Sequence, residues 1–315
     1  MPDIANAYKF QRKMIAVESV YLKQIAGYRR DARRVMLEII ERDGVTRQAV
    51  NQMVNTVSDL SRLVNTAASA ASREARKNVM NYTRKQIQLA EKVGLAPNAD
   101  IAPVLNAGVV VAQDAEQSYM TSNSAWLAQL ETSIQTQVAK LRISQASPQE
   151  ITDRLLSETL ADGRASVWLA NGNQAKSEET TNLWSYSVGL LGAYMMIYNE
   201  QQPETKYQKQ AIATIDERTT DCCLRAHGQI QPLDEPFHLT GTPRFADEVQ
   251  DPPFHWYCRT SEALYNEAFE DVGITTEKMK DMAQIELEDR ELTGKRIEIH
   301  PSHSTSRRAG ALPSG

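Results

Sequence analysis

The chain has 315 residues, of which 41% are hydrophobic and 6% aromatic, and its formal net charge is −5 at pH 7. This length allows a sizeable core and two domains, whereas the negative charge gives no overall electrostatic reason to bind nucleic acid, so a DNA contact would need a local basic patch. No window approaches the roughly 18 apolar residues of a membrane-spanning helix, and the first residues contain no apolar run of signal-peptide type, so we expect a soluble protein made in a cytoplasm.

The first part of the sequence is patterned for two long helices. Apolar residues recur at helical spacing from Ile4 to about Arg42, and Asp43-Gly44 breaks the pattern. Thr46 is a suitable cap for a second helix over about 47–93. The apolar stripe of this second helix consists of Val50, Met53, Val54, Val57, Leu60, Leu63 and Val64. We therefore expect residues 1–146 to form an extended helical region that binds partners through its helix faces.

Shorter helical patterns follow in the middle of the chain. They cover Val104 to Met120, Ser124 to Ile143 and about Gln174 to Asn199. Between the last two, Ser147-Pro148-Gln149-Glu150 is a good helix start, because serine can cap and proline suits the first helical position. We assign residues 147–174 to a connecting helix and linker.

The character of the sequence changes after Gln202-Pro203. The segment from Gln210 to Ile215 alternates like a short strand, a proline-rich stretch follows, and Glu277 to Leu292 returns to a helical pattern. Residues 294–315 cannot build a core and are expected to form a flexible tail. The expected fold class is therefore mainly α, with a small, loop-rich α+β domain over residues 175–293.

The cysteines and histidines of this domain are clustered. All three cysteines of the chain, and three of its five histidines, fall between Cys222 and Cys258. Two short pairs stand out, Cys223-x3-His227 and His255-x2-Cys258, and two such pairs separated by a loop are what a tetrahedral zinc site needs. Two alternatives stay open. Cys222 could substitute for Cys223, or all these residues could be ordinary buried side chains, since cysteine is among the most buried residue types.

A longer signature surrounds the two pairs. Its elements are Asp216-Glu217-Arg218-Thr219-Thr220, Cys223, His227-Gly228, Asp234-Glu235-Pro236-Phe237 and Pro252-Pro253-Phe254-His255-Trp256-Tyr257-Cys258-Arg259, preceded by Ala175-Lys176-Ser177-Glu178. In order and spacing this resembles the signature of the phage Mu F-like family of minor head proteins. Alignment on Arg218 and Gly228 selects Cys223 as the family cysteine. The sequence departs from the family pattern at Lys176, which replaces an arginine, at Trp256, where His-Pro is commonest, and in a longer loop over 239–251.

The resemblance implies a structural role in a virion rather than catalysis. It implies a minor capsid protein that acts in phage head morphogenesis near the portal vertex, in multiple copies per head, after synthesis in the bacterial host cytoplasm. Its partners would be the portal and major capsid proteins, with packaged DNA as a further contact if the protein aids genome packaging or delivery. No membrane partner is expected.

The signature residues are expected to hold loops in place. Zinc would be a structural cofactor bound by Cys223, His227, His255 and Cys258, and we assign no catalytic residue. The residues assigned to structural roles are Asp216, Arg218, Thr219, Gly228 and Arg259. Among them, Arg218 and Arg259 each offer five donors that can reach several loop carbonyls, and Asp216 can orient one of these forks.

Two other classes of function remain as alternatives. The first is an enzyme, either a metal-dependent hydrolase or transferase or a thiol hydrolase with a Cys223–His227 pair. The second is a DNA-binding head protein that uses basic helix faces. The basic clusters are Arg29, Arg30, Arg33 and Arg34, and Arg73, Arg76, Lys77, Arg84 and Lys85. The simpler interpretation of these clusters is a solvated face balanced by Asp31, Glu38 and Glu74.

Overall fold

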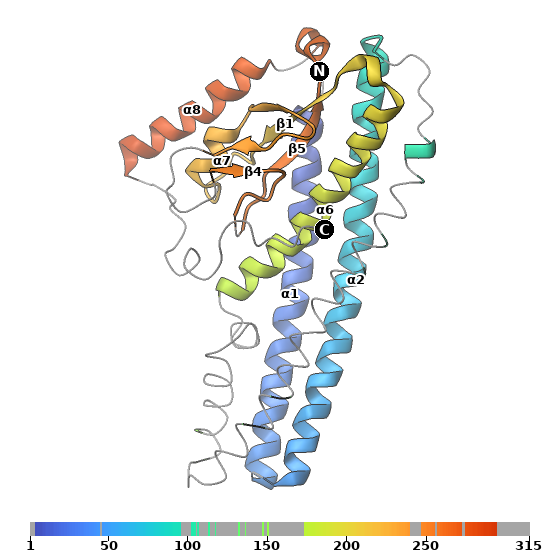
Figure 1. Cartoon of the computed structure of the whole chain (residues 1–315). Helices are drawn as coiled ribbons and strands as arrows, with labels where there is room; N and C mark the ends of the chain where they lie inside the picture. Colours follow the sequence, from blue (N-terminus) through green and yellow to red (C-terminus); the bar gives the residue numbers. More distant parts are fainter. Residues whose placement is uncertain are drawn as a thin grey trace. The chain divides into compact units, whose positions relative to one another are not determined.

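A computed structural model describes residues 4–44, 46–95, 173–239, 247–255, 257–272 and 275–294, together with isolated positions between 102 and 150. In these ranges the chain is mainly helical with a few antiparallel strands in its C-terminal part, which confirms the expected fold class (Figure 1). The predicted helices over 104–120 and 124–143, the segment 147–174 and the tail beyond 294 lie wholly or mostly outside the described residues. The predicted cap at Ser147 is described, and its Oγ accepts the Glu150 amide at 3.2 Å.

The two long helices have nearly the predicted bounds. Helix α1 spans Ile4–Asp43 and helix α2 spans Arg47–Lys92. Between them Gly44 adopts a φ of +60° and donates its amide hydrogen to the Ile40 carbonyl at 2.9 Å. Thr46 caps α2 as predicted, because its Oγ1 accepts the Ala49 amide at 3.1 Å.

The chain divides into two compact units, each made of separate stretches of sequence. One unit contains Glu18–Ala71 and Glu116–Glu179, and the other contains Met1–Val17, Ser72–Ala115 and Thr180–Gly315. Helices α1 and α2 therefore contribute residues to both units. The units are discontinuous in sequence, whereas each region expected from the sequence is one continuous stretch.

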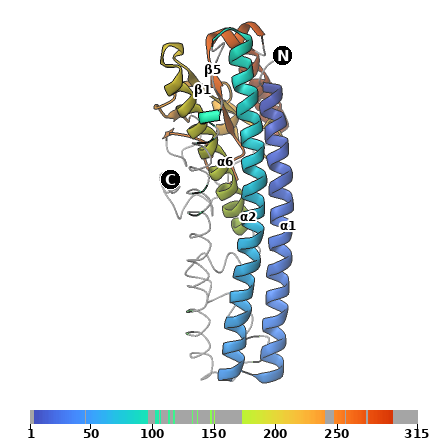
Figure 2. The same ribbon diagram turned by 90° about the vertical axis from the view of Figure 1, so that its right-hand side faces the viewer.

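In the unit that contains Glu18–Ala71, segments of α1 and α2 lie side by side with their apolar faces buried (Figure 2). Most of the predicted stripe is buried or half-buried. Met53, Val57, Leu60 and Val64 are buried, Val50 and Val54 are half-buried, and Leu63 is 36% exposed. A polar contact accompanies the apolar one, since the Tyr21 hydroxyl donates to Glu179 at 2.6 Å.

The other unit contains a three-stranded antiparallel sheet in the order β2-β1-β5. Its strands are β1 Gln208–Ile212, β2 Ile230–Pro232 and β5 Ser261–Tyr265. The predicted strand over 210–215 is present as β1 but lies earlier in the chain. It ends at Ile212 because the next residue, Ala213, donates its amide hydrogen to His227 Nδ1 at 2.9 Å instead of to a strand.

The remaining elements of this unit are short, apart from two helices. They are α6 Asn173–Gln201, which begins in the other unit, η1 Pro203–Thr205, α7 Asp221–Ala226, β3 Phe237–His238, β4 Glu248–Val249, η2 Glu267–Val272 and α8 Thr276–Thr293. Strands β3 and β4 pair antiparallel. Helices α6 and α8 have nearly the predicted bounds, and α8 is capped at its start by the Thr275 side chain, which accepts the Lys278 amide.

Both long helices supply buried glutamines to the sheet. Gln11 of α1 donates from Nε2 to the Ile212 carbonyl at 2.7 Å and to Ser261 Oγ at 3.0 Å. Gln86 of α2 accepts the Leu264 amide at 2.9 Å. These bonds satisfy polar groups of β1 and β5. Residues of α1 and α2, which precede the sheet in sequence, therefore take part in the packing of the sheet.

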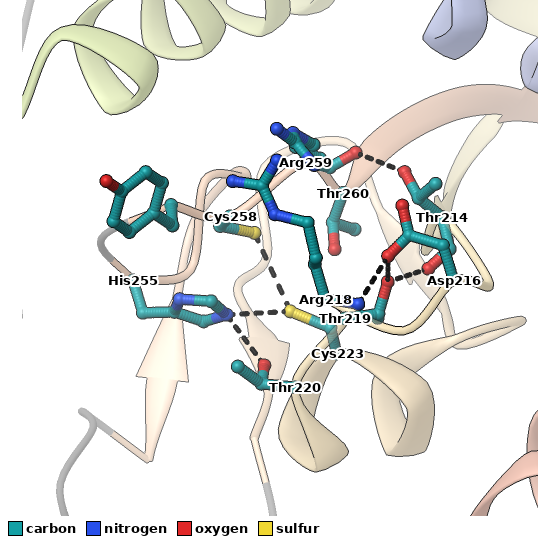
Figure 3. A pocket seen from close by; sticks show the side chains of 11 residues that line it. Thr214, Asp216, Arg218, Thr219, Thr220, Cys223, His255, Cys258, Arg259 and Thr260 are labelled. Atoms are coloured by element: carbon teal, nitrogen blue, oxygen red, sulfur yellow. Dashed lines mark hydrogen bonds between the residues drawn. The ribbon is translucent and has the colours of Figure 1, made fainter. Parts of the chain in front are cut away.

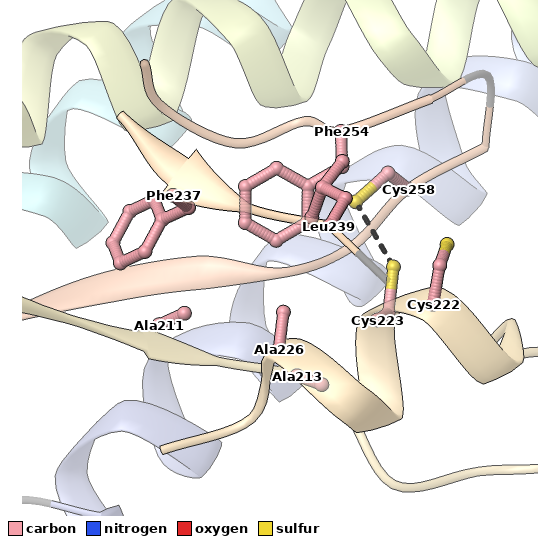
Figure 4. Packing of buried hydrophobic residues seen from close by; sticks show 9 residues of the cluster. All are labelled: Ala211, Ala213, Cys222, Cys223, Ala226, Phe237, Leu239, Phe254 and Cys258. Carbon is pink, nitrogen blue, oxygen red and sulfur yellow. Dashed lines mark hydrogen bonds between the residues drawn. The ribbon is translucent and has the colours of Figure 1, made fainter. Parts of the chain in front are cut away.

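A small apolar core lies between the sheet and α7 (Figure 4). Phe237 and Phe254 meet edge to face with ring centroids 5.7 Å apart. The buried members of the core are Ala211, Ala213, Cys222, Cys223, Ala226, Phe237, Leu239, Phe254 and Cys258. All three cysteines therefore belong to this core. Among the helices described, none combines the length and apolarity that crossing a bilayer requires.

Candidate metal centre

Two segments bring the cysteines and His255 together. Cys222 and Cys223 lie in the first turn of α7, while His255 and Cys258 lie on the segment that leads from Pro253 to β5. Cys223 Sγ is 2.9 Å from His255 Nε2 and 3.6 Å from Cys258 Sγ (Figure 3). In a tetrahedral zinc site, two sulfurs at about 2.3 Å from the ion lie about 3.7 Å apart. The spacing of Cys223 and Cys258 therefore suits two ligands of one ion.

Cys222 also belongs to this cluster. The ligand atoms of Cys222, Cys223 and His255 all lie within 4.8 Å of one another, so this group could hold a metal ion. The Thr220 hydroxyl lies 3.1 Å from Cys222 Sγ and 2.8 Å from His255 Nε2. Burial raises the pKa of the Cys258 thiol well above its usual range, which favours the protonated form when no cation is present.

His227 is not part of the cluster, and its prediction as a ligand needs correction. Its Nδ1 accepts the Ala213 amide at 2.9 Å, and its Nε2 lies 3.4 Å from the Tyr8 hydroxyl. Because Nδ1 is an acceptor, the proton of the neutral ring is on Nε2. Burial lowers the pKa of His227 to about 4, so the ring is neutral near pH 7. Both ring nitrogens are therefore occupied in joining α1 to the end of β1.

The signature around Asp216 forms a closed turn. The Asp216 carboxylate accepts the Arg218 amide at 2.9 Å and the Thr219 hydroxyl at 3.0 Å. The Thr219 hydroxyl also approaches the Thr214 carbonyl, and the Thr214 hydroxyl donates to the Arg259 carbonyl at 3.1 Å. These bonds connect the loop before α7, which leads into Cys222 and Cys223, with the loop before β5, which carries Cys258.

The arginine that forks onto this loop is Arg290 of α8, which the sequence prediction missed. Its Nη1 donates to the Thr219 carbonyl at 2.6 Å and to Asp221 at 3.0 Å, and its Nη2 donates to the Asp216 carbonyl at 3.1 Å. The fork was expected from Arg218 or Arg259. Instead, the Arg218 guanidinium lies 5.8 Å from the centre of the Tyr257 ring.

Gly228 occupies a position that requires glycine. Its φ is +79°, and a Cβ there would lie 3.2 Å from Lys280 Cγ and 3.3 Å from Met279 Cβ. Its amide donates to the Ala211 carbonyl at 2.9 Å. The glycine therefore lets the chain turn from α7 toward β2 directly beneath α8.

A small hollow adjoins the cluster (Figure 3). Its lining includes the exposed Arg218 and the half-buried Asp216, so it can be reached from solvent. The space suits about one water molecule or one ion rather than an organic substrate. The lining residues are Thr214, Asp216, Arg218, Thr219, Thr220, Cys223, His255, Tyr257, Cys258, Arg259 and Thr260.

A second polar cluster lies on the sheet. Lys209 of β1 is 1% exposed and donates to Asp251 at 2.9 Å and to the Gln250 carbonyl at 2.7 Å. Glu262 of β5 is 0% exposed, and neither of its carboxyl oxygens has a hydrogen-bond partner among the described residues when the group is ionised. Burial, and next the Asp251 carboxylate, raise the pKa of Glu262 well above its usual range, while Lys209 acts in the opposite direction.

Some residues of the basic clusters on the long helices are paired with carboxylates. Arg34 lies 3.9 Å from Asp31 and 2.8 Å from Glu38, and Lys77 lies 3.6 Å from Glu74. Arg29 is 2% exposed and lies 3.8 Å from Glu179, so it cannot belong to a solvent-facing basic patch. Asp31, Glu38 and Glu74 therefore pair with basic residues, as the simpler interpretation expected. Arg29 was expected on a solvated face, and this expectation was wrong because the residue is buried.

Part of the site had signals in the sequence. Cys222 is adjacent to a predicted ligand, and Arg290 falls on the buried face of α8 with Met279 and Ala283 at helical spacing. Gln11 had no such signal, since one polar residue in a long amphipathic helix does not indicate which backbone group it will satisfy.

Comparisons of the chain with models of protein families, with curated proteins and with solved structures give no match.

Proposed function

We propose that this protein is a minor capsid protein of a phage head, and that its C-terminal module is a non-catalytic docking domain for head assembly near the portal vertex. The proposal starts from the Mu F-like signature in the sequence. Its partners would be the portal and major capsid proteins, and contact with packaged DNA would be secondary, because the net charge of the chain is −5 and Arg34 and Lys77 of the basic clusters are paired with carboxylates.

The observation that carries the proposal is the mutual bonding of the signature residues. Asp216 and Thr219 close a turn, Thr214 joins that turn to the Arg259 carbonyl, and Gly228 fits beneath α8. The side chains of Asp216, Thr219 and Thr214 each bond a backbone group of these loops. Residues employed in this way stabilise a shape, which is what a docking domain requires.

We further propose that the cluster binds zinc as a structural cofactor. The ligands would be Cys223, His255 and Cys258, with Cys222 in place of the predicted His227. The 3.6 Å between the sulfurs of Cys223 and Cys258 supports these two residues as ligands of one ion. Cys222, Cys223 and His255 form a group within 4.8 Å that does not include Cys258, so binding through all four residues would draw Cys258 toward that group. Four protein ligands leave no open position for a substrate, which agrees with a structural role.

A second candidate function is thiol catalysis. It is favoured by one contact, the 2.9 Å between Cys223 Sγ and His255 Nε2, which resembles a nucleophile and its base. Against it, Cys223 is 2% exposed, and His255 Nε2 also lies 2.8 Å from the Thr220 hydroxyl. The adjoining hollow is too small for a peptide or nucleotide.

The test is complementation of a phage whose copy of this gene has been deleted. Heads are purified and the protein in them is counted by quantitative mass spectrometry, for the parent, for the double variant Cys223→Ser, His255→Ala, and for Arg225→Met as a surface control. We expect the parent and the control to enter heads with the portal protein, and the double variant to lose solubility and head association together.

Two results would overturn the proposal. Heads that form and infect normally without this protein would remove the assembly role. A double variant that folds and enters heads normally, yet loses an activity on DNA or peptide that the parent shows, would favour thiol or metal catalysis instead.

A further inference from the structure

The structure assigns a second chemical state to the cysteine cluster: we infer that Cys223 and Cys258 form a reversible disulfide when the metal is absent. The two sulfurs lie 3.6 Å apart and face each other (Figure 4), and both residues line the hollow. Both thiols are free in this structure. This inference rests on the proposed function for the metal-bound state and for the change of compartment, whereas the disulfide itself needs no metal.

The pairing is selective for Cys258 over Cys222. Cys222 and Cys223 are neighbours in a helix, where consecutive Cα atoms are about 3.8 Å apart, less than the span that an ordinary disulfide bridges. Cys258 comes from a different segment, and its side chain already points at Cys223. To bond, the sulfurs must close from 3.6 Å to about 2 Å.

The metal and the disulfide exclude each other. Two sulfurs bound to one zinc ion are about 3.7 Å apart, whereas bonded sulfurs are about 2 Å apart. The same two atoms cannot hold both arrangements. Oxidation would therefore release the ion, and bound zinc would protect the thiols. In either state α7 stays joined to the loop before β5.

The oxidant would be a small peroxide that enters the hollow. In the reaction with hydrogen peroxide, two thiols and one peroxide give one disulfide and two waters. The O–O bond breaks and the S–S bond forms, both sulfurs are oxidised, and the two sulfhydryl hydrogens leave in the waters. The lining of the hollow includes the exposed Arg218, so a molecule of this size has a route from solvent.

A reason for two states follows from the proposed location. A phage protein is made in a reducing cytoplasm, where thiols and metal persist, and the particle later enters an oxidising medium, where disulfides persist. A cross-link between the same two segments would be available in both compartments. The disulfide would replace the metal outside the cell.

The experiment uses the full chain after treatment with a metal chelator. The protein is exposed to hydrogen peroxide, remaining free thiols are alkylated, and intact mass and peptide maps are recorded with and without dithiothreitol. We expect the parent to lose the mass of two hydrogens, to show Cys223 linked to Cys258 within one chain, and to recover on reduction. The variant Cys222→Ser, which keeps both partners, should form the same link.

Zinc-loaded protein should oxidise at least about tenfold more slowly, with release of zinc as the link forms. The inference is overturned if Cys222 enters the link, if the link joins two chains, or if peroxide yields only sulfenic or sulfinic adducts. If the parent retains no zinc before chelation, the proposal of a structural metal is wrong. The disulfide inference is unaffected by that result, because the link is measured on metal-free protein.

Discussion

At the scale of single residues, Gly228 shows how one backbone position determines whether two elements can pack. The residue combines a left-handed φ with close approach to Lys280 and Met279 of α8. Gly294 also has a left-handed φ, of +68°, but an added Cβ there would meet nothing within 4 Å. Alanine at position 294 would therefore be strained only by the backbone conformation, whereas alanine at position 228 would also crowd α8.

We predict that Gly228→Ala lowers the free energy of unfolding more than Gly294→Ala does. The left-handed conformation costs an alanine about 1 kcal/mol at either site. At position 228 displacement of α8 adds to this, for a total of about 2 kcal/mol or more. Urea denaturation of both variants measures the difference. Equal losses would mean that α8 is not packed on this turn.

His227 gives a prediction for acid. Its pKa falls from 6.5 to about 4 on folding because of burial. The folded chain therefore binds fewer protons than the unfolded chain between these values, and the free energy of unfolding decreases as pH falls through that window, by about 3 kcal/mol in total. His227→Asn keeps an acceptor for the Ala213 amide but does not titrate. Parent and variant curves should diverge below pH 6.5, and parallel curves would contradict this role.

At the scale of elements, one buried arginine of α8 bonds α7 and the loop before it. Arg290 is 3% exposed and donates two hydrogen bonds to carbonyls of the loop before α7 and one to Asp221 of α7. We predict that Arg290→Met costs about 3 kcal/mol, because Asp221 and two carbonyls lose their donor. The matched control is Arg225→Met, an exposed arginine of α7, which should change stability little. Hydrogen exchange should show faster exchange of the α8 amides in Arg290→Met only. Protection of α8 in that variant would show that Arg290 does not fix α8 to α7 and its preceding loop.

The buried carboxyl of Glu262 in β5 lowers the free energy of unfolding as pH rises. Folding raises the pKa of Glu262 above 4.5, so the folded chain retains a proton that the unfolded chain gives up. This contribution to stability is complete below pH 4.5 and is lost as pH rises toward the folded pKa. We predict that Glu262→Gln matches the parent at pH 4 and is more stable than the parent at pH 8. Glu267→Gln, at an exposed position, is the control. A destabilised variant at pH 8 would show that the ionised carboxylate is needed.

At the scale of the whole molecule, apolar periodicity predicted where the helices lie in the sequence, but not which elements they pack against. The bounds of α1, α2, α6 and α8 follow from apolar spacing and caps that are local in sequence. Strand β1 was displaced because its ends depend on pairing with β2 and β5, which are remote in sequence. Strands of two or three residues, such as β3, carry no alternation that a sequence pattern could reveal.

The candidate site was predictable to a similar extent. Spacing identified Cys223, His255 and Cys258 as neighbours, because two short pairs joined by a loop tend to converge. It placed His227 wrongly, since spacing does not tell which way a side chain points after α7 ends. There the buried amide of Ala213 needed an acceptor, and His227 supplied it. Contacts set by remote backbone groups cannot be inferred from local residue patterns.

The most direct test of the account is the metal content of the purified chain and of two histidine variants. Inductively coupled plasma mass spectrometry should find a single zinc ion per chain in the parent and in His227→Asn, and a loss of zinc in His255→Asn. Circular dichroism confirms that each variant is folded. A folded parent without zinc, or zinc retained in His255→Asn but lost in His227→Asn, would contradict the assignment of the cluster as a structural metal centre.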